Sequence, residues 1–431
     1  MSLVRTSLLN GVAVLTKLGT NILLNKVLAV FVGPAGYAII GQFQNLASMV
    51  TTFASGALNT GVTKYTAEYH AQPERQHLVW RTAGALSLAG SLVFAPALVL
   101  FRVPIASWAL ADANLSGVIV WLAVALPLLL INGLLLAILN GRKAVRVYVA
   151  ANISGSIVTA ATALLLVTHY GLYGALIAVA ISQAVACLAT ALLVFRSAPI
   201  PFTQLLHLPD ARVARQLGGY ALMGATSALV VPVCQIFIRD NLAAQLGWHT
   251  TGLWQALSKI SDTHLMLLTT TLSIYFLPRF AEIQDGSELR AEIRKGYRFV
   301  LPLVLTSAAL LFLFRVLLVR ALLTPDFMPL VDVLGIQLLG DVLKIGSWVM
   351  AYTLFSHAQT RTFIVTEVIF SIIWAASAVL LAKVFGLAGA CAGYVLTYAL
   401  YWITMYWLFG RLTSRLDASK GATAALSAPS L

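Results

Sequence analysis

Residues 114–139 read NLSGVIVWLAVALPLLLINGLLLAIL, a stretch without a charged side chain. About 20 apolar residues in a helix cross the hydrocarbon core of a bilayer, so this stretch is long enough to span it. Similar stretches recur along the chain, in which 60% of the 431 residues are hydrophobic and 10% are charged. They lack the strict alternation of a membrane β-barrel strand. The sequence therefore predicts an all-α integral membrane protein.

Apolar runs separated by Gly, Pro and short charged connections predict twelve transmembrane helices. The connections include Gly33-Pro34, Gly171, Pro278 and Gly386. The predicted spans are 7–31, 36–62, 80–101, 114–139, 147–168, 172–195, 217–242, 250–277, 298–321, 329–356, 362–383 and 388–410.

The net charge is +13, and the basic residues lie in the predicted connections rather than in a nucleic-acid-binding patch. If the N-terminus is cytoplasmic, most Lys and Arg fall on the cytoplasmic side, in loops such as those around Arg142 and Arg290. This bias matches the positive-inside rule. We therefore expect both termini to be cytoplasmic, with a first span that is retained rather than removed as a signal peptide.

Short patterns repeat at an offset of 215 residues. The pattern GLxGA occurs at Gly171 and Gly386, and Arg146 and Arg361 each open a predicted span. Six helices per copy keep the two copies parallel, and parallel repeats are typical of transporters whose substrate site lies between the halves. The predicted organisation is an N-terminal six-helix lobe, a cytoplasmic linker, a C-terminal six-helix lobe and a disordered cytoplasmic tail. These cover residues 1–203, 204–216, 217–410 and 411–431.

Motifs of soluble enzymes, such as Walker A and HExxH, are missing from the sequence. The three cysteines lie in apolar runs without metal-ligand spacing, so neither a cofactor nor a metal site is expected. A chain without an ATPase motif must rely on an ion gradient, the gradient of its substrate or a partner for transport.

Charged and polar residues inside the predicted spans are the candidate site, because charge in lipid is costly. Lys17 and Asn21 share one side of the first span, and Gln255, Lys259 and Asp262 share a face of the eighth. The remaining candidates are Asp341, Lys344, Glu367 and Tyr398 in the tenth to twelfth spans.

These candidates have two readings. Lysines facing a wet cavity would attract an anionic substrate, which makes Lys17, Lys259 and Lys344 the substrate-binding candidates, together with Asn21, Gln255 and Tyr398. Asp262, Asp341 and Glu367 would couple transport to a proton or sodium ion. Structural ion pairs between helices, and ordinary packing of Tyr398, explain the same residues. At the 215-residue offset, Asp341 and Lys344 correspond to Leu126 and Leu129, so the polar residues do not follow the repeat.

Four segments, taken in order, resemble Wzx-type polysaccharide flippases, in particular those for lipid-linked O-antigen and enterobacterial common antigen units. They are FVGPAG at 31–36, NTGVTKY at 59–65, LWQALSKISD at 253–262 and GDVLK at 340–344. This family lies within the multidrug/oligosaccharidyl-lipid/polysaccharide exporter superfamily. The resemblance implies two six-helix lobes around a central cavity that opens to one side at a time.

The resemblance further implies transfer of an undecaprenyl-diphosphate-linked oligosaccharide from the cytoplasmic to the periplasmic leaflet of a bacterial inner membrane. A polysaccharide polymerase and a chain-length regulator are the implied partners, and nucleic acid is not. Two other functions stay open. One is an ion-coupled multidrug exporter of the same superfamily, for which a carboxylate-rich or aromatic cavity is expected. The other is a membrane scaffold, although the loops offer little mass for docking.

Overall fold

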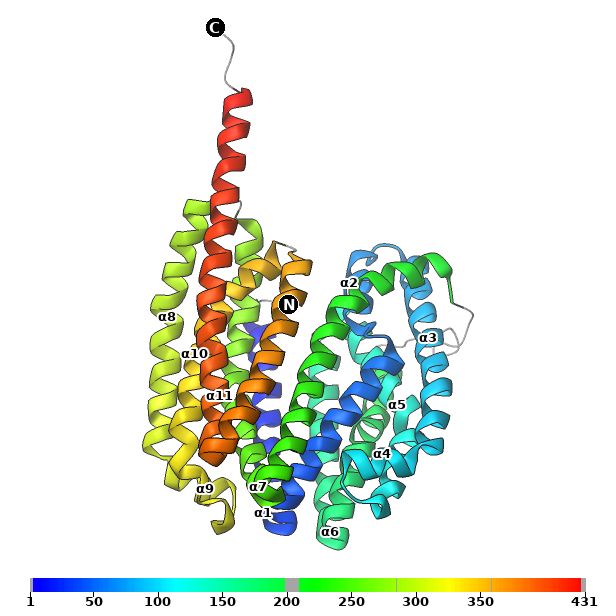
Figure 1. The fold of residues 1–431 in the computed structure, drawn as a ribbon. Helices are drawn as coiled ribbons and strands as arrows, with labels where there is room; N and C mark the ends of the chain where they lie inside the picture. Colours follow the sequence, from blue (N-terminus) through cyan, green and yellow to red (C-terminus); the bar gives the residue numbers. More distant parts are fainter. Residues whose placement is uncertain (1–2, 198–208, 284, 358, 428–431) are drawn as a thin grey trace. The chain divides into compact units, whose positions relative to one another are not determined.

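The computed structural model describes residues 3–197, 209–283, 285–357 and 359–427, and these segments are almost entirely helical (Figure 1). The elements in chain order are α1 (Leu3–Ser55), α2 (Asn59–Glu68), α3 (Pro73–Leu100), α4 (Arg102–Ala109), η1 (Ala113–Leu115), α5 (Ser116–Gly141), α6 (Val145–Ser197), α7 (Ala211–Glu282), α8 (Gly286–Leu313), α9 (Arg315–Leu322), η3 (Pro325–Phe327), α10 (Leu330–Ser356) and α11 (Thr360–Ser427).

Within the described residues, eight helices are long and apolar enough to cross a bilayer. The chain is therefore a multi-pass membrane protein. Four of these helices, α1, α6, α7 and α11, each contain one glycine with non-helical backbone angles. These glycines are Gly33, Gly171, Gly247 and Gly386, all with positive φ.

In α6 and α11 these glycines join two arms that pack against each other as a hairpin. In α11, whose ribbon folds back on itself in Figure 1, Ser377 Oγ on one arm donates to the Gly393 carbonyl on the other at 3.1 Å. In α6, Thr159 Oγ1 donates to the Ser182 carbonyl at the same distance, 3.1 Å. Glycine suits such a turn because it adopts positive φ without a steric penalty.

The chain forms two compact units. The N-lobe comprises Met1–Ile236 with Leu322–Thr324, and the C-lobe comprises Phe237–Ala321 with Pro325–Leu431. In the N-lobe, α5 supplies much of the apolar core, including the fully buried Leu122 and Leu126. In the C-lobe, α7, α8, α10 and α11 pack together around residues such as Phe280 and Val349.

The order of elements repeats along the chain. Helices α3 and α8 each have 28 residues, α4 and α9 each have 8, and a three-residue 3-10 turn follows each pair, η1 and η3. Arg146 and Arg361, predicted to correspond, are each the second residue of a long helix, α6 and α11. The lengths and order of these helices are thus alike in the two halves of the chain.

Two boundaries differ from the prediction. The predicted span 36–62 ends at Ser55, because Gly56 and Ala57 both adopt positive φ and stop the helix before α2 begins. The predicted disordered tail is wrong in secondary structure, because α11 continues through Ser427. Arg, Leu and Ala in this segment favour a helix. Part of the predicted linker, 204–208, lies outside the described residues.

Candidate functional site

Asp341 is the centre of a buried polar cluster in the C-lobe. Its side chain is completely shielded from solvent on α10, inside a helix bundle. Its Oδ1 accepts hydrogen bonds from Ser261 Oγ on α7 and, at 3.2 Å, from Tyr394 OH on α11. Its Oδ2 lies 3.3 Å from Nδ1 of His264, also on α7. A buried carboxylate is tolerated when such partners replace its water.

A second layer of hydrogen bonds extends this arrangement. Nε2 of His264 lies 2.8 Å from Ser307 Oγ on α8, and Gln337 Nε2 on α10 donates to Ser261 Oγ at 3.4 Å. The cluster therefore joins four helices of one lobe through polar contacts. We call the following residues the C-lobe polar cluster: Ser261, His264, Ser307, Gln337, Asp341 and Tyr394.

Lys344 lies next to the cluster, one helical turn after Asp341, in an aromatic setting. Its Nζ is 5.3 Å from the ring centroid of Trp348, 5.8 Å from that of Tyr394 and 5.4 Å from that of Tyr398. The ammonium also interacts electrostatically with Asp341 and hydrogen-bonds with the Tyr398 hydroxyl. Aromatic faces attract a cation, so the rings hold Lys344 in place while leaving its charge available.

Glycines on α10 allow α11 to approach closely enough to deliver these rings. A Cβ at Gly340 would lie 2.3 Å from Cδ1 of Tyr394, and one at Gly346 would lie 2.6 Å from the Trp402 ring. Both separations are far inside van der Waals contact. The GDVLK segment therefore combines the charged residues with the glycine that admits their aromatic partner.

Aromatic rings continue outward from the cluster along α7 and α11. The Trp374 ring packs against Tyr394 with centroids 6.0 Å apart, and the Trp254 ring lies 6.4 Å from Trp374. Tyr394 also contacts Tyr398 edge to face at 4.8 Å. Such pairs stabilise by about 0.5–1.5 kcal/mol each beyond their buried area. Tyr394 and the predicted site residue Tyr398 are thus both packed into the lobe.

The structure brings only part of the predicted site together. Asp341, Lys344 and Tyr398 are neighbours, and the half-buried Glu367 on α11 interacts electrostatically with Lys344. Asp262 is exposed, although it also interacts electrostatically with Lys344.

Gln255 and Lys259 differ from each other in their surroundings. Gln255 is buried, and its Oε1 accepts a hydrogen bond of 2.8 Å from Nε of the buried Arg239. The Arg239 guanidinium also lies 5.6 Å from the Trp254 ring centroid. Gln255 thus helps to fix a buried cation in the lobe, while Lys259 is half-buried.

The remaining two predicted residues belong to the N-lobe. On the first arm of α1, Lys17 is exposed and Asn21 is half-buried. The positions that correspond to Asp341 and Lys344 in this lobe, Leu126 and Leu129, are buried in its apolar core. At these positions the C-lobe has a buried carboxylate, Asp341, where the N-lobe has a buried leucine.

The candidates drawn from the sequence do not include the nearby Arg239 or these members of the C-lobe polar cluster: Ser261, His264, Ser307, Gln337 and Tyr394. A signal was available for His264, the one histidine within a predicted span, three residues after Ser261 and so on the same helix face.

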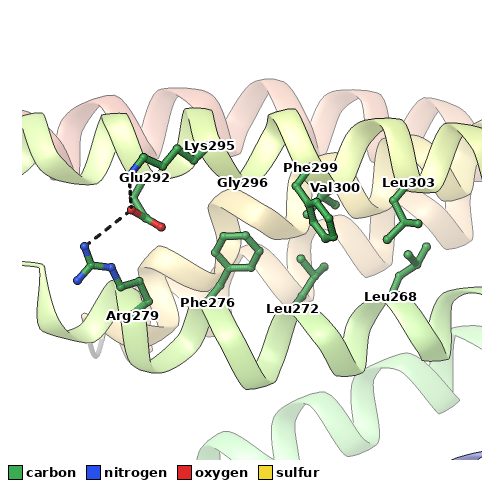
Figure 2. A pocket seen from close by; sticks show the side chains of 10 residues that line it. All are labelled: Leu268, Leu272, Phe276, Arg279, Glu292, Lys295, Gly296, Phe299, Val300 and Leu303. Atoms are coloured by element: carbon green, nitrogen blue, oxygen red, sulfur yellow. Dashed lines mark ion pairs between the residues drawn. The ribbon is translucent and has the colours of Figure 1, made fainter.

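A separate cavity of about 440 Å³ lies between α7 and α8 of the C-lobe (Figure 2). Its walls are apolar, with Leu272, Phe276 and Val300 pointing inward. At one end the buried Glu292 pairs with Arg279 at 3.8 Å and with Lys295 at 3.7 Å. Apolar walls suit hydrocarbon, and the charged end suits a polar head group.

In the parts of the chain that the structure describes, no group of three or more His, Cys, Asp or Glu side chains is placed to hold an ion. Cys187, Cys234 and Cys391 are buried, and none of the three forms a disulfide bond. The described residues offer the positive charge of Lys344 and the hydrogen-bonding groups of Asp341 and His264.

Comparison with solved structures identifies the fold. The chain matches an inward-facing multidrug resistance MATE family transporter of the MOP superfamily with a TM-score of 0.77, at 15% identity, covering 94% of this chain and 96% of that one. It matches an outward-facing MATE transporter of the same superfamily with a TM-score of 0.65, at 15% identity, covering 96% of each chain. At this identity the likeness shows the fold alone.

Sequence comparison identifies the family. Residues 3–284 match the family model described as polysaccharide biosynthesis protein. The chain is 31% identical over 401 residues to the Lipid III flippase of Escherichia coli (strain K12), which covers 93% of this chain and 96% of the relative. The Lipid III flippase of Shigella flexneri matches to the same extent, 31% over 401 residues. The chain therefore belongs to the family of polysaccharide biosynthesis proteins.

Proposed function

We propose that this protein is a flippase that moves an undecaprenyl-diphosphate-linked oligosaccharide from the cytoplasmic to the periplasmic leaflet by alternating access. The observation that carries the proposal is the 31% identity to Lipid III flippases over 93% of the chain. It makes the protein a transporter rather than an enzyme, acting in the assembly of enterobacterial common antigen or O-antigen. Its location is the bacterial inner membrane, where a polysaccharide polymerase and a chain-length regulator use the product.

The membrane topology belongs to the same proposal. Counting each arm of α1, α6, α7 and α11 as one span turns eight long helices into twelve. Segments of 41, 53, 39 and 58 residues support this count, since one span needs about 20. Two six-helix lobes and cytoplasmic termini follow from an even number of spans and from the positive-inside bias.

Within this function, Lys344 is the residue we assign first to the diphosphate. It lies inside a span, among aromatic rings that hold it without cancelling its charge. Lys17 and Lys259 are the further candidates for the diphosphate, and Asn21 and Tyr398 for the sugars. Gln255 acts on the site through Arg239. Asp341 is the coupling residue we favour over the exposed Asp262 and over Glu367.

A multidrug exporter is the second candidate, and the MATE fold favours it. Cationic drugs require aromatic or acidic surroundings without a competing cation. In the C-lobe the aromatic rings already surround the Lys344 ammonium, which would repel a cationic drug. An anionic lipid carrier suits this arrangement better.

Reconstituted vesicles test the proposal. The full chain is inserted into liposomes of phosphatidylethanolamine and phosphatidylglycerol with an undecaprenyl-diphosphate-linked oligosaccharide that carries a fluorophore on its sugar. Dithionite, added outside, quenches only the outward-facing probe. We expect the protein to make the whole probe population accessible. Transport of ethidium without movement of the lipid probe would instead identify a multidrug exporter.

A matched pair of lysine variants locates the charge requirement. Lys344→Ala should slow lipid translocation by about tenfold or more, because about 1.4 kcal/mol of lost interaction corresponds to a factor of ten. Lys344→Arg should recover part of the rate, since it keeps the charge with a different geometry. Lys383→Ala removes an exposed lysine of α11 and should leave the rate unchanged. Equal rates for Lys344→Ala and Lys383→Ala would exclude Lys344 from substrate binding.

A further inference from the structure

The buried pair of Asp341 and His264 has the geometry of a reversible proton-binding site. Asp341 Oδ2 and His264 Nδ1 lie 3.3 Å apart inside the C-lobe, and the side chains are 0% and 6% exposed. We propose that these two residues bind a single proton between them and that this proton is the ion that drives transport. This inference rests on the proposed flippase function for its transport readout, but the site itself can be tested without it.

Hydrogen-bond donors can be counted around the pair in its proton-loaded state. Ser307 Oγ lies 3.0 Å from the Val304 carbonyl, to which it donates its only hydrogen. It must then accept from Nε2–H of His264, at 2.8 Å. With Nε2 protonated, the contact between Nδ1 and Asp341 Oδ2 needs one more proton, on either atom. The pair is then neutral overall.

Removing that proton leaves a second complete pattern. His264 keeps one hydrogen, which moves to Nδ1 and donates to the ionised Asp341. Nε2 becomes an acceptor, and the Ser307 hydroxyl turns from the Val304 carbonyl to donate to it. The carbonyl keeps its own helical hydrogen bond. Since no buried polar atom loses its last partner in either state, proton uptake and release avoid the cost of an unsatisfied group.

The partners of Asp341 favour a proton over a metal cation. Ser261 and Tyr394 both point hydroxyl hydrogens at Oδ1, and His264 contributes a ring nitrogen at Oδ2. Sodium, like other hard cations, needs several oxygen lone pairs directed at it. A carboxylate surrounded by donors and an imidazole presents few. This arrangement therefore favours a proton, rather than sodium, as the coupling ion.

Charged groups from the surrounding helices link the proton to the substrate. Helix α10 contributes Lys344, and α11 contributes Glu367 with the hydroxyls of Tyr394 and Tyr398. Helix α7 contributes the half-buried Lys259 and the exposed Asp262, while Ser307 of α8 adds a neutral hydroxyl. Lys344 is the counter-ion of Asp341 when that carboxylate is ionised. Lys344, the residue assigned to the diphosphate, therefore also interacts with the proton site.

Infrared difference spectroscopy tests the site directly on the purified full chain. We expect a pH-dependent carboxyl band in the wild type that disappears in Asp341→Asn. His264→Asn, which keeps a donor near the Nδ1 position, should shift the titration of this band. Asp332→Asn, an exposed carboxylate on the same helix as Asp341, is the matched control and should leave it unchanged. A band that survives Asp341→Asn, or that titrates identically in His264→Asn, would overturn the proposal.

Transport in the vesicles gives the second readout. A pH gradient should accelerate lipid translocation by the wild type and by Asp332→Asn. It should have no effect on Asp341→Asn, whose unaccelerated exchange of lipid shows that the variant is folded. A rate that depends on sodium and ignores the pH gradient would overturn the proton assignment.

The two proposals can fail separately. If the wild type moves no lipid probe but its Asp341 band titrates with His264, the flippase function fails and the proton site stands. If lipid moves and both Asp341→Asn and His264→Asn keep their response to the pH gradient, the flippase function stands and the coupling role fails.

Discussion

Gly171 and Gly386 adopt the same backbone conformation at corresponding points of the two lobes, with φ and ψ of 54° and −130° at the first and 59° and −137° at the second. Gly33 and Gly247 form a second such pair, with φ of 66° and 81° and ψ of −177° and 162°. At each of these four positions a Cβ would meet no atom within 4 Å. Backbone conformation, rather than crowding, therefore explains the glycines.

Gly386→Ala should lower the stability of the protein by about 1–3 kcal/mol, because a residue with a Cβ is strained at this conformation. Thermal unfolding in detergent measures the change. Gly410→Ala, in the same helix and with equally open surroundings, is the control and should stabilise by about 0.5–1 kcal/mol. Equal shifts for the two variants would show that the positive φ at Gly386 carries no strain.

Gly340→Ala should impair transport as well as stability. The new Cβ would lie 2.3 Å from Cδ1 of Tyr394, so the ring must leave the position from which it donates to Asp341. Overpacking of this kind costs about 1–3 kcal/mol. The rate of lipid translocation and the melting temperature should both fall, whereas Gly410→Ala should leave the rate of transport unchanged. Normal transport by Gly340→Ala would show that the place of the Tyr394 ring is unimportant.

Arg239→Ala should destabilise the C-lobe by about 1–3 kcal/mol, since it leaves the buried Gln255 oxygen without its 2.8 Å donor. The double variant Arg239→Met with Gln255→Leu should regain part of this loss, because it removes both partners and refills the space. Unfolding in detergent gives the double-mutant cycle. Additive losses would show that the two side chains are not coupled. The exposed Arg102→Ala is the control and should be neutral.

Asp210→Ala should lower the melting temperature at neutral pH. Asp210 precedes α7 and accepts hydrogen bonds from the backbone N–H groups of Val213 at 3.0 Å and Arg212 at 2.9 Å. The hydrogen bond from Val213, above all, lowers the pKa of this carboxyl group. A carboxyl group with a lowered pKa stabilises the folded state above its unfolded pKa, and this contribution disappears as the pH falls through the folded value.

The difference between wild type and Asp210→Ala should therefore shrink in acid. Asp210→Asn keeps an acceptor at the start of α7 without titrating, so its deficit relative to wild type should be smaller and should also close in acid. A deficit of Asp210→Ala that stays constant with pH would show that the ionised carboxylate is not what stabilises the helix start.

Most of the fold could be predicted because apolar runs, and the Gly and Pro residues that interrupt them, mark the helices directly in the sequence. Gly171 and Gly386 were recognisable as one feature occurring twice. The early end of the predicted span 36–62 could not be recognised, because the left-handed conformation at Ala57 depends on the surrounding turn and not on alanine itself. Likewise, the helix within residues 411–427 follows from the helix propensity of its residues, which the prediction of a disordered tail did not consider.

The candidate site was only partly predictable for a geometric reason. Asp341 and Lys344 stand out because a charged residue in an apolar run can be recognised from the sequence alone. Their partners depend on the rotation of α7, where adjacent residues differ by about 100°. That rotation turns Ser261 and His264 toward Asp341 and leaves Asp262 exposed. A sequence cannot supply this angle without knowing which face packs against α10.

The aromatic contacts around Tyr394 also give the protein a built-in optical reporter. Trp374 lies 6.0 Å from the Tyr394 ring, and Trp254 lies 6.4 Å beyond it. Indole emission responds to nearby charge and to ring displacement, so the fluorescence of these two side chains should register events at Asp341 without an attached dye. The tryptophans of the N-lobe are Trp80, Trp108 and Trp121, and replacing them with phenylalanine would confine the signal to the C-lobe. Stopped-flow fluorescence of such a variant would then measure the rates of the transport cycle from the tryptophans of the C-lobe.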